Sequence, residues 1–144
     1  HAKRNPYNEI ECSDHYARSM ASYGVFLAAC GFEYHGPQGR IGFAPRITPD
    51  DFRAPFTSAK GWGTFSQQRG NGSQLAQIEL RWGELELRQI ALIVPNDSRI
   101  ETCEARLNGD FRAVGLNQQN DRVEITLEEP VLMAAGSTLK IDLN

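Results

Sequence analysis

The spacing of the apolar positions changes once along the chain, after Gly31. Before that point, residues 13–30 contain no proline, and apolar side chains recur at the spacing of one helical face: Tyr16, Met20, Tyr23 and Leu27. Ser13 is suited to cap the start of a helix, and Gly31 is suited to the left-handed conformation that commonly ends one. The pattern therefore predicts one long helix over residues 13–30.

The second half of this predicted helix, residues 20–30, carries no charged side chain on any face. A helix that is apolar all round is normally buried all round. Its small residues would allow other backbones to approach closely: Ala21, Ser22, Gly24, Ala28 and Ala29. We therefore expect neighbouring helices that these 144 residues do not contain. The alternative is that the β-region covers one side and a second copy of the chain covers the other, which would give a homo-oligomer formed through the apolar helix.

After residue 31 the pattern becomes that of short strands separated by glycine and proline. Residues 32–34 and 40–43 flank a five-residue loop, and this arrangement predicts a hairpin. Residues 52–59 and 62–67 predict two further strands. The first part of the β-region is therefore expected to consist of hairpins.

A glycine-rich segment at residues 69–73 is the most loop-like stretch of the chain. We take it as a boundary and expect three parts. Residues 1–31 form a lead-in and a helix, residues 32–69 form a β-hairpin region that packs on the helix, and residues 70–144 form a C-terminal antiparallel β-module.

The second half of the chain alternates apolar and polar positions as half-buried strands do. The alternation places Trp82 on the inward face, so we expect it in the core, and it suggests a turn at residues 83–84. Leu87 and Ile90 are in opposite phases. Because a change of phase needs an extra residue, we predict a β-bulge near residues 88–89.

Four more strands complete the pattern. Residues 102–107 and 111–116 are joined by Asn108-Gly109, a strong signal for a tight turn, and residues 123–127 and 139–143 alternate clearly. Regularly spaced strands of this kind are typical of two-sheet folds. The chain is predicted to be mainly β with one long N-terminal helix, as an antiparallel β-sandwich or jelly-roll-like module.

Composition narrows the possible partners and cofactors. The net charge is −3, and the acids and bases are interspersed without a basic stripe, so we expect no nucleic-acid partner. Three cysteines fit neither a disulfide framework nor a metal knuckle and are expected to be buried as small apolar side chains: Cys12, Cys30 and Cys103. The histidines have no metal-ligand spacing: His1, His15 and His35. No cofactor is predicted.

Glu9 and Arg18 are the main polar candidates for a site. Within a single helix, nine residues at about 100° each would place them on opposite faces. They can converge if Glu9 belongs to the lead-in and Arg18 to the second turn of the helix. A carboxylate and a guanidinium then form either a structural ion pair or a fork of acceptors and donors for neighbouring hydroxyls. The residues alone leave both interpretations open.

Two other features suggest carbohydrate. Trp62 lies between Gly61 and Gly63, which would suit the rim of a sugar site, although packing against the helix is an equal alternative. Glu9 and Glu11 superficially resemble the carboxylate pair of a glycoside hydrolase. Alternate residues of an extended lead-in face apart, so we do not assign catalysis to that pair.

Six strings in order give the chain a family resemblance: RNPYNEIEC at 4–12, HYARSMASYG at 15–24, GFEY at 31–34, GFAPR at 42–46, FR at 52–53 and GWGTF at 61–65. Residues 4–67 resemble the C-terminal part of the catalytic region of the non-lysosomal glucosylceramidase, or bile-acid β-glucosidase, family of retaining glycoside hydrolases. Ser13 departs from the glycine that usually follows the family's cysteine.

That family combines an N-terminal β-sandwich with an (α/α)6 toroid, so the resemblance implies that the helix over 13–30 is a remnant of the toroid. It also implies that Glu9 and Arg18 hold hydroxyls of the sugar substrate, while the catalytic carboxylates lie upstream, outside this chain. The chain is then expected to be the C-terminal part of a retaining β-glycosidase of the β-glucosidase or glucosylceramidase type. Alone it would be inactive, and its partners would be a β-glucoside and the N-terminal part of the enzyme. The alternative is a non-catalytic β-sandwich module that binds carbohydrate or a protein.

Overall fold

The computed structural model describes residues 16–144, with side chains from residue 21 onward. One helix is followed by ten strands and a short 3-10 helix: α1 (Tyr16–Cys30), β1 (Glu33–His35), η1 (Gly36–Gln38), β2 (Arg40–Phe43), β3 (Asp51–Thr57), β4 (Gly61–Gly70), β5 (Ser73–Ile93), β6 (Cys103–Leu107), β7 (Asp110–Arg112), β8 (Val114–Gln119), β9 (Arg122–Ala134) and β10 (Thr138–Leu143). The predicted class, mainly β with one helix, is confirmed.

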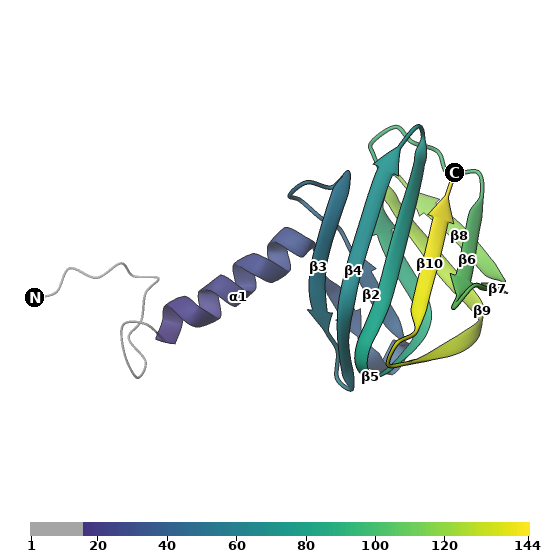
Figure 1. The fold of residues 1–144 in the computed structure, drawn as a ribbon. Helices are drawn as coiled ribbons and strands as arrows, with labels where there is room; N and C mark the ends of the chain where they lie inside the picture. Colours follow the sequence, from purple (N-terminus) through teal and green to yellow (C-terminus); the bar gives the residue numbers. More distant parts are fainter. Residues whose placement is uncertain (1–15) are drawn as a thin grey trace, which may run out of the picture.

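The long strand β5 belongs to both layers of a β-sandwich (Figure 1). Its first half pairs with β4 and β10, and this layer continues to β3 on one side and to β6 and β7 on the other. Its second half pairs with β2 and β9, and that layer continues to β1 and β8. All of these pairings are antiparallel except that of β2 with β5, which is parallel. The module is therefore sandwich-like, with one departure from the predicted antiparallel arrangement.

Aromatic side chains join the two layers in the core. Phe43 from β2 and Phe65 from β4 stack with their ring centroids 3.8 Å apart. Phe56 meets the edge of Phe43 at 5.8 Å, and Phe52 lies 6.2 Å from Phe65. All four rings are buried because alternate residues of each strand face inward.

The path of β5 differs in one respect from the sequence prediction and agrees in another. The expected turn at residues 83–84 is absent, since β5 runs through this point without a break. The predicted bulge is confirmed, because the register of β5 against β9 shifts between Leu87 and Gln89. The shift brings the apolar side chains on both sides of it to the core face.

The predicted strand over 111–116 is in fact two strands. β7 pairs with β6 in one layer, and β8 pairs with β9 in the other, so the chain crosses between layers at Ala113. The apolar positions change phase between Ala113 and Val114, at the crossing itself, so the sequence did carry a signal for the break. The Asn108-Gly109 turn between β6 and β7 is confirmed, with both residues at positive φ.

The remaining hairpins follow the prediction closely. β1 pairs with β2 around η1, and β3 pairs with β4. The proposed boundary at residues 69–73 falls at the tip of the β4–β5 hairpin, and strands on both sides of it contribute to one hydrophobic core. The division into three parts stays a prediction.

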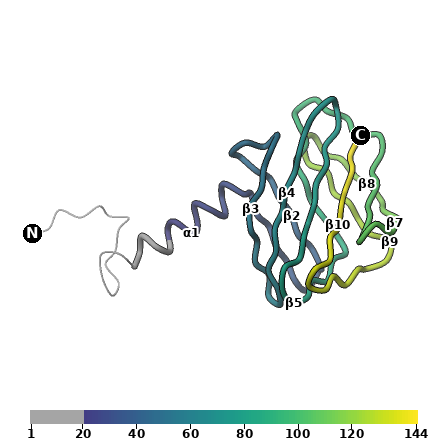
Figure 2. Tube along the Cα trace, viewed as in Figure 1, coloured from purple at the N-terminus to yellow at the C-terminus, as the bar shows by residue number. Residues whose placement is uncertain are grey.

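α1 points away from the sandwich, as both overall views show (Figure 1, Figure 2). It ends at Cys30 as predicted, with Gly31 in the left-handed conformation at φ +55°. The N–H of Ala44 donates to the carbonyls of Cys30 and Gly31 at 3.2 and 3.1 Å, which fixes the helix end to the strands. Within residues 16–144, no helix is both long and apolar enough to cross a membrane.

Candidate functional site

The two residues assigned to sugar binding lie at or beyond the limit of the structure. Glu9 is outside the described residues, and Arg18 lies in α1 at a position whose side chain is not described. Their convergence on one ligand therefore stays a prediction. The same applies to the expected burial of Cys12, which also precedes the described residues.

The third candidate, Trp62, lies on the outer face of the sandwich beside a second tryptophan. Trp62 on β4 and Trp82 on β5 are direct cross-strand partners, and their exposed fractions are 49% and 62%. The prediction that Trp82 belongs to the core is wrong. The register of β4 against β5 shifts between Trp62 and Gly63, so that Gly63 pairs with Leu80 and Arg81 is the extra residue. This bulge turns Trp82 to the face opposite Leu80.

Three glycines explain why the two strands pair in this way. A Cβ on Gly63 would lie 2.2 Å from the carbonyl oxygen of Glu79, and one on Gly61 would lie 2.6 Å from that of Trp82. Gly83 has φ +79°, and its Cβ would lie 2.0 Å from the carbonyl oxygen of Lys60. No larger residue fits these backbone contacts. Glycines on both strands around the tryptophans were the sequence signal for a bulge here.

An ion pair lies on each side of the tryptophans. Lys60 Nζ is 3.2 Å from Glu84 Oε1 at the end of the hairpin, and Arg81 Nη2 is 2.9 Å from Glu79 Oε2 on the other side. Together the four charged side chains offer hydrogen-bond donors and acceptors at both ends of the aromatic pair.

The exposed side chains of this outer face continue from the tryptophans to α1. Thr57 on β3 is the cross-strand partner of Trp62, and its Oγ1 is 3.3 Å from the hydroxyl of Tyr23 on α1. A cleft of about 320 Å³ lies at this end of the sandwich and includes Lys60, Glu84 and Tyr34. The tryptophan pair is thus bordered by hydroxyl and charged groups.

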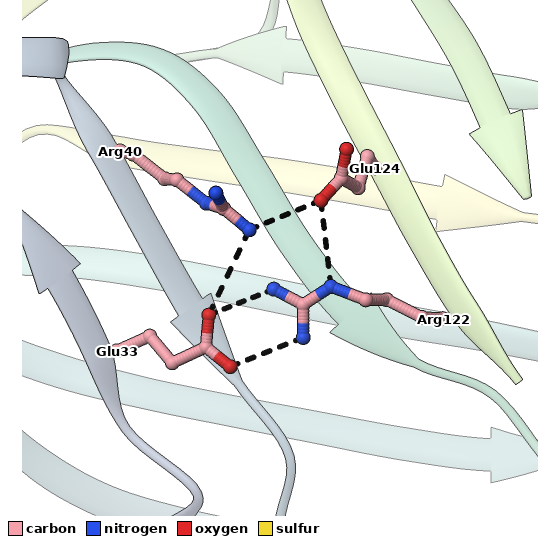
Figure 3. A network of polar contacts seen from close by, with 4 residues as sticks. All are labelled: Glu33, Arg40, Arg122 and Glu124. Atoms are coloured by element: carbon pink, nitrogen blue, oxygen red, sulfur yellow. Dashed lines mark hydrogen bonds and ion pairs between the residues drawn. The ribbon is translucent and has the colours of Figure 1, made fainter. Parts of the chain in front are cut away.

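A second polar cluster lies on the other layer (Figure 3). Arg122 on β9 donates to both carboxylate oxygens of Glu33 on β1, at 3.1 and 2.7 Å, and Arg40 on β2 donates to Glu124 at 3.0 Å. The hydrogen bond from Arg122 is the main cause that lowers the pKa of Glu33, and the same bond raises the pKa of Arg122. Each charge faces an opposite charge, so the cluster fastens β1 and β2 to β9 and is unsuited to proton transfer.

A third polar cluster lies at the end of the sandwich away from the tryptophans, near the tip of the β4–β5 hairpin. Arg69 Nε donates to Gln74 at 2.8 Å, its Nη2 donates to the carbonyl of Ile93, and Gln67 donates to the carbonyl of Pro49 at 2.6 Å. Burial lowers the pKa of Arg69. Its polar neighbours are backbone and amide groups and the Asp50 carboxylate, 3.9 Å from Nη1, all of the protein itself, which indicates a structural role.

The described cysteines are poor nucleophiles. Cys30 is buried as expected and Cys103 is partly buried, and both are free thiols. Burial, with a smaller contribution from Asp142, raises the pKa of Cys103 to about 11. Among residues 16–144, no group of three His, Cys, Asp or Glu side chains is placed to hold a metal ion.

The chain has a distant structural neighbour among solved glycoside hydrolases. No family model and no curated protein matches the sequence. The α-L-rhamnosidase from Dictyoglumus thermophilum has a TM-score of 0.46 and 12% sequence identity, over 94% of this chain and 15% of its own. This chain thus spans about 15% of the length of that glycoside hydrolase. The similarity is too low to assign a function.

Proposed function

We propose that this chain is the C-terminal part of a retaining β-glycosidase of the β-glucosidase or glucosylceramidase type. In this proposal Glu9 and Arg18 hold hydroxyls of the sugar, and the catalytic carboxylates belong to an upstream part of the enzyme. The resemblance of the ordered strings from residue 4 to residue 67 to the glucosylceramidase family suggests this assignment.

The structural observation that supports the proposal is the environment of α1. Its chain from Ala21 to Cys30 has no charged side chain, yet Tyr23 is 53% exposed and Val25 is 69% exposed. The C-terminal end of α1 is fastened to the chain after β2 by backbone hydrogen bonds at Cys30 and Ala29, and Tyr23 contacts Thr57 on β3, which leaves the Val25 side of the helix uncovered. A helix of this composition is normally enclosed, and further helices of a toroid would enclose it.

The chemistry assigned to the site is positioning. A carboxylate at Glu9 would accept hydrogen bonds from sugar hydroxyls, and the guanidinium of Arg18 would donate to them. Such groups contribute to catalysis when their contacts strengthen in the transition state. Loss of either would leave polar groups of the enzyme–sugar complex unpaired.

The test compares the product of the native reading frame with this 144-residue chain, at equal molarity, in the hydrolysis of an aryl β-glucoside. We expect activity only in the longer product. In that product, Glu9→Gln or Arg18→Ala should lower kcat/KM by about 5- to 150-fold, since an unpaired buried polar group costs about 1–3 kcal/mol. Glu11→Gln and Arg53→Ala are the matched controls, and they should change kcat/KM less than about threefold by the same relation.

Unchanged kinetics in both Glu9→Gln and Arg18→Ala would remove the site assignment. An inert product of the native reading frame would instead favour the second candidate, a non-catalytic module that binds carbohydrate or a protein. The exposed tryptophan pair is the observation that keeps this candidate open.

The helix can be tested separately from catalysis. A Val25→Cys variant of the 144-residue chain should react readily with an alkylating reagent, because Val25 is 69% exposed. In the longer product the same cysteine should be protected by neighbouring helices. Equal reactivity in the two proteins would contradict the toroid assignment.

A further inference from the structure

We propose that Trp62 and Trp82 form a platform that binds an unbranched chain of β-linked pyranose sugars by stacking. The site lies on the outer face of β4 and β5 and is made entirely by this chain. It does not depend on Glu9, Arg18 or upstream catalytic groups, so it can be present whether or not the glycosidase proposal holds.

The exposure of these side chains is the first argument. The chain has two tryptophans, and both lie on the same face as direct partners of adjacent strands. Tryptophan is highly buried on average, and a folded protein gains by covering it. Two exposed indoles next to each other therefore indicate a surface that meets a ligand.

The position of the pair is fixed by the backbone. Gly61, Gly63 and Gly83 allow contacts between β4 and β5 that no side chain would permit, and the bulge at Arg81 sets the face on which Trp82 lies. A site held by paired strands is more rigid than one on a loop. The platform is thus available to a ligand without the ordering cost of a mobile segment.

The surroundings of the pair select the class of ligand. A pyranose ring has an apolar C–H face and a rim of hydroxyl groups, so it needs an aromatic surface with hydrogen-bonding groups at its edges. The ion pairs Lys60–Glu84 and Arg81–Glu79 provide donors and acceptors at the two ends.

Nucleic acid is the other ligand that stacks on aromatic side chains, and it requires a positively charged groove. Here each basic group beside the tryptophans is paired with a carboxylate, and the net charge of the chain is −3. The electrostatics therefore favour a neutral ligand.

The shape of the surface favours an extended chain. Adjacent strands lie about 4.8 Å apart, so the two indoles side by side form a surface longer than one sugar ring. Trp82 and Trp62 lie in a line across the strands, and the next residue in that line is Thr57 on β3, whose hydroxyl can bond a further sugar hydroxyl. A β-linked glucan is a flat ribbon that can lie along this surface, whereas an α-linked glucan coils away from it.

The two tryptophans also provide the fluorescence signal by which sugar binding is measured. Because the 144-residue chain has no other tryptophan, selective excitation of indole fluorescence reports on the site alone. Titration with cellohexaose should give a saturable change in emission, with glucose and maltohexaose binding at least about tenfold more weakly, which is about 1.4 kcal/mol. Trp62→Ala and Trp82→Ala, followed through the remaining indole, should each raise Kd by about tenfold or more, the same free-energy difference.

Two matched variants separate stacking from a general loss of structure. Trp62→Tyr keeps a stacking ring and should restore part of the affinity lost in Trp62→Ala. Phe111→Ala removes an exposed aromatic ring from β7 and should leave the Kd for cellohexaose unchanged.

Three binding results would overturn the proposal: no change in emission with cellohexaose up to its solubility limit, the same Kd in both alanine variants as in the parent, or equal affinity for maltohexaose. A fourth would be an emission shift that depends on protein concentration in the absence of sugar, which would show that a second copy of the chain covers the platform. None of these measurements involves hydrolysis. A failure here is therefore distinguishable from a failure of the glycosidase proposal.

Discussion

The phenyl rings of Phe43 on β2 and Phe65 on β4 lie parallel, with their centroids 3.8 Å apart and their planes inclined by 2°. This contact joins the two layers of the sandwich directly. Both rings are buried, and the edges of the stack are covered by Phe56 and Phe52. The stack is therefore a point where the loss of one side chain leaves a cavity that its neighbours cannot easily fill.

We expect Phe65→Ala to lower the free energy of unfolding by about 3–5 kcal/mol, the usual range for removal of a fully buried phenyl ring. Urea denaturation followed by circular dichroism measures the change. Phe111→Ala is the control, because this ring is 58% exposed and its removal should cost less than about 0.5 kcal/mol. Equal losses in the two variants would contradict the assigned core.

The glycines between β4 and β5 lead to a second prediction. Gly63→Ala should be destabilising by about 1–3 kcal/mol, because the added methyl group would lie 2.2 Å from the carbonyl oxygen of Glu79 and the backbone must shift. Gly115 on β8 is the matched control, since a Cβ there meets nothing within 4 Å. Gly115→Ala should be neutral or slightly stabilising through its effect on the unfolded chain. Thermal denaturation of the two variants makes the comparison.

The features predicted correctly from the sequence have local causes. The end of α1 follows from Gly31, and the bulge at residues 88–89 follows from a change in the alternation of apolar residues. The Asn108-Gly109 turn likewise depends only on residues that can adopt positive φ.

The features that were missed depend on which strands become neighbours. Trp82 continues the alternation of Leu80, and only the pairing with β4 shows that Arg81 is an extra residue. The parallel pairing of β2 with β5 and the crossing at Ala113 are also determined by partners distant in the sequence. For the candidate site, the glycines around Trp62 left a rim position and packing against the helix as equal alternatives, and the second tryptophan could be placed beside it only with the register known.

The ion pairs on the second layer predict that the free energy of unfolding depends on pH in the acid range. The pKa of Glu33 is lowered by its hydrogen bond from Arg122, so the ionised carboxylate stabilises the folded state. A lowered pKa gives stability that is present above the ordinary value of 4.5 and is lost as the pH falls through the folded-state value.

Glu33→Gln should therefore lower the free energy of unfolding by about 0.5–1 kcal/mol at neutral pH and low salt, as expected for a partly exposed pair. The difference from the parent should shrink below pH 4.5 and at high salt. Glu128→Gln on β9 is a comparison for the loss of one acidic charge on an exposed strand position. If both variants show the same dependence on pH, the bidentate contact contributes nothing specific.

The buried thiol of Cys103 predicts the opposite change, a loss of stability as the pH rises in the alkaline range. Burial and the nearby Asp142 carboxylate raise its pKa from 9.0 to about 11, so the folded state holds the thiol proton more tightly than the unfolded state does. Stability from this group is complete below pH 9.0 and is lost as the pH rises toward about 11. In Cys103→Ala that loss should be absent, so the free energy of unfolding should fall less steeply over this interval than in the parent.

The same burial predicts that Cys103 reacts with a disulfide reagent at pH 8 far more slowly in the folded chain than in urea, because the thiolate is the reactive form. Equal rates in the two states would show that Cys103 is neither desolvated nor shielded by the β6–β10 pairing.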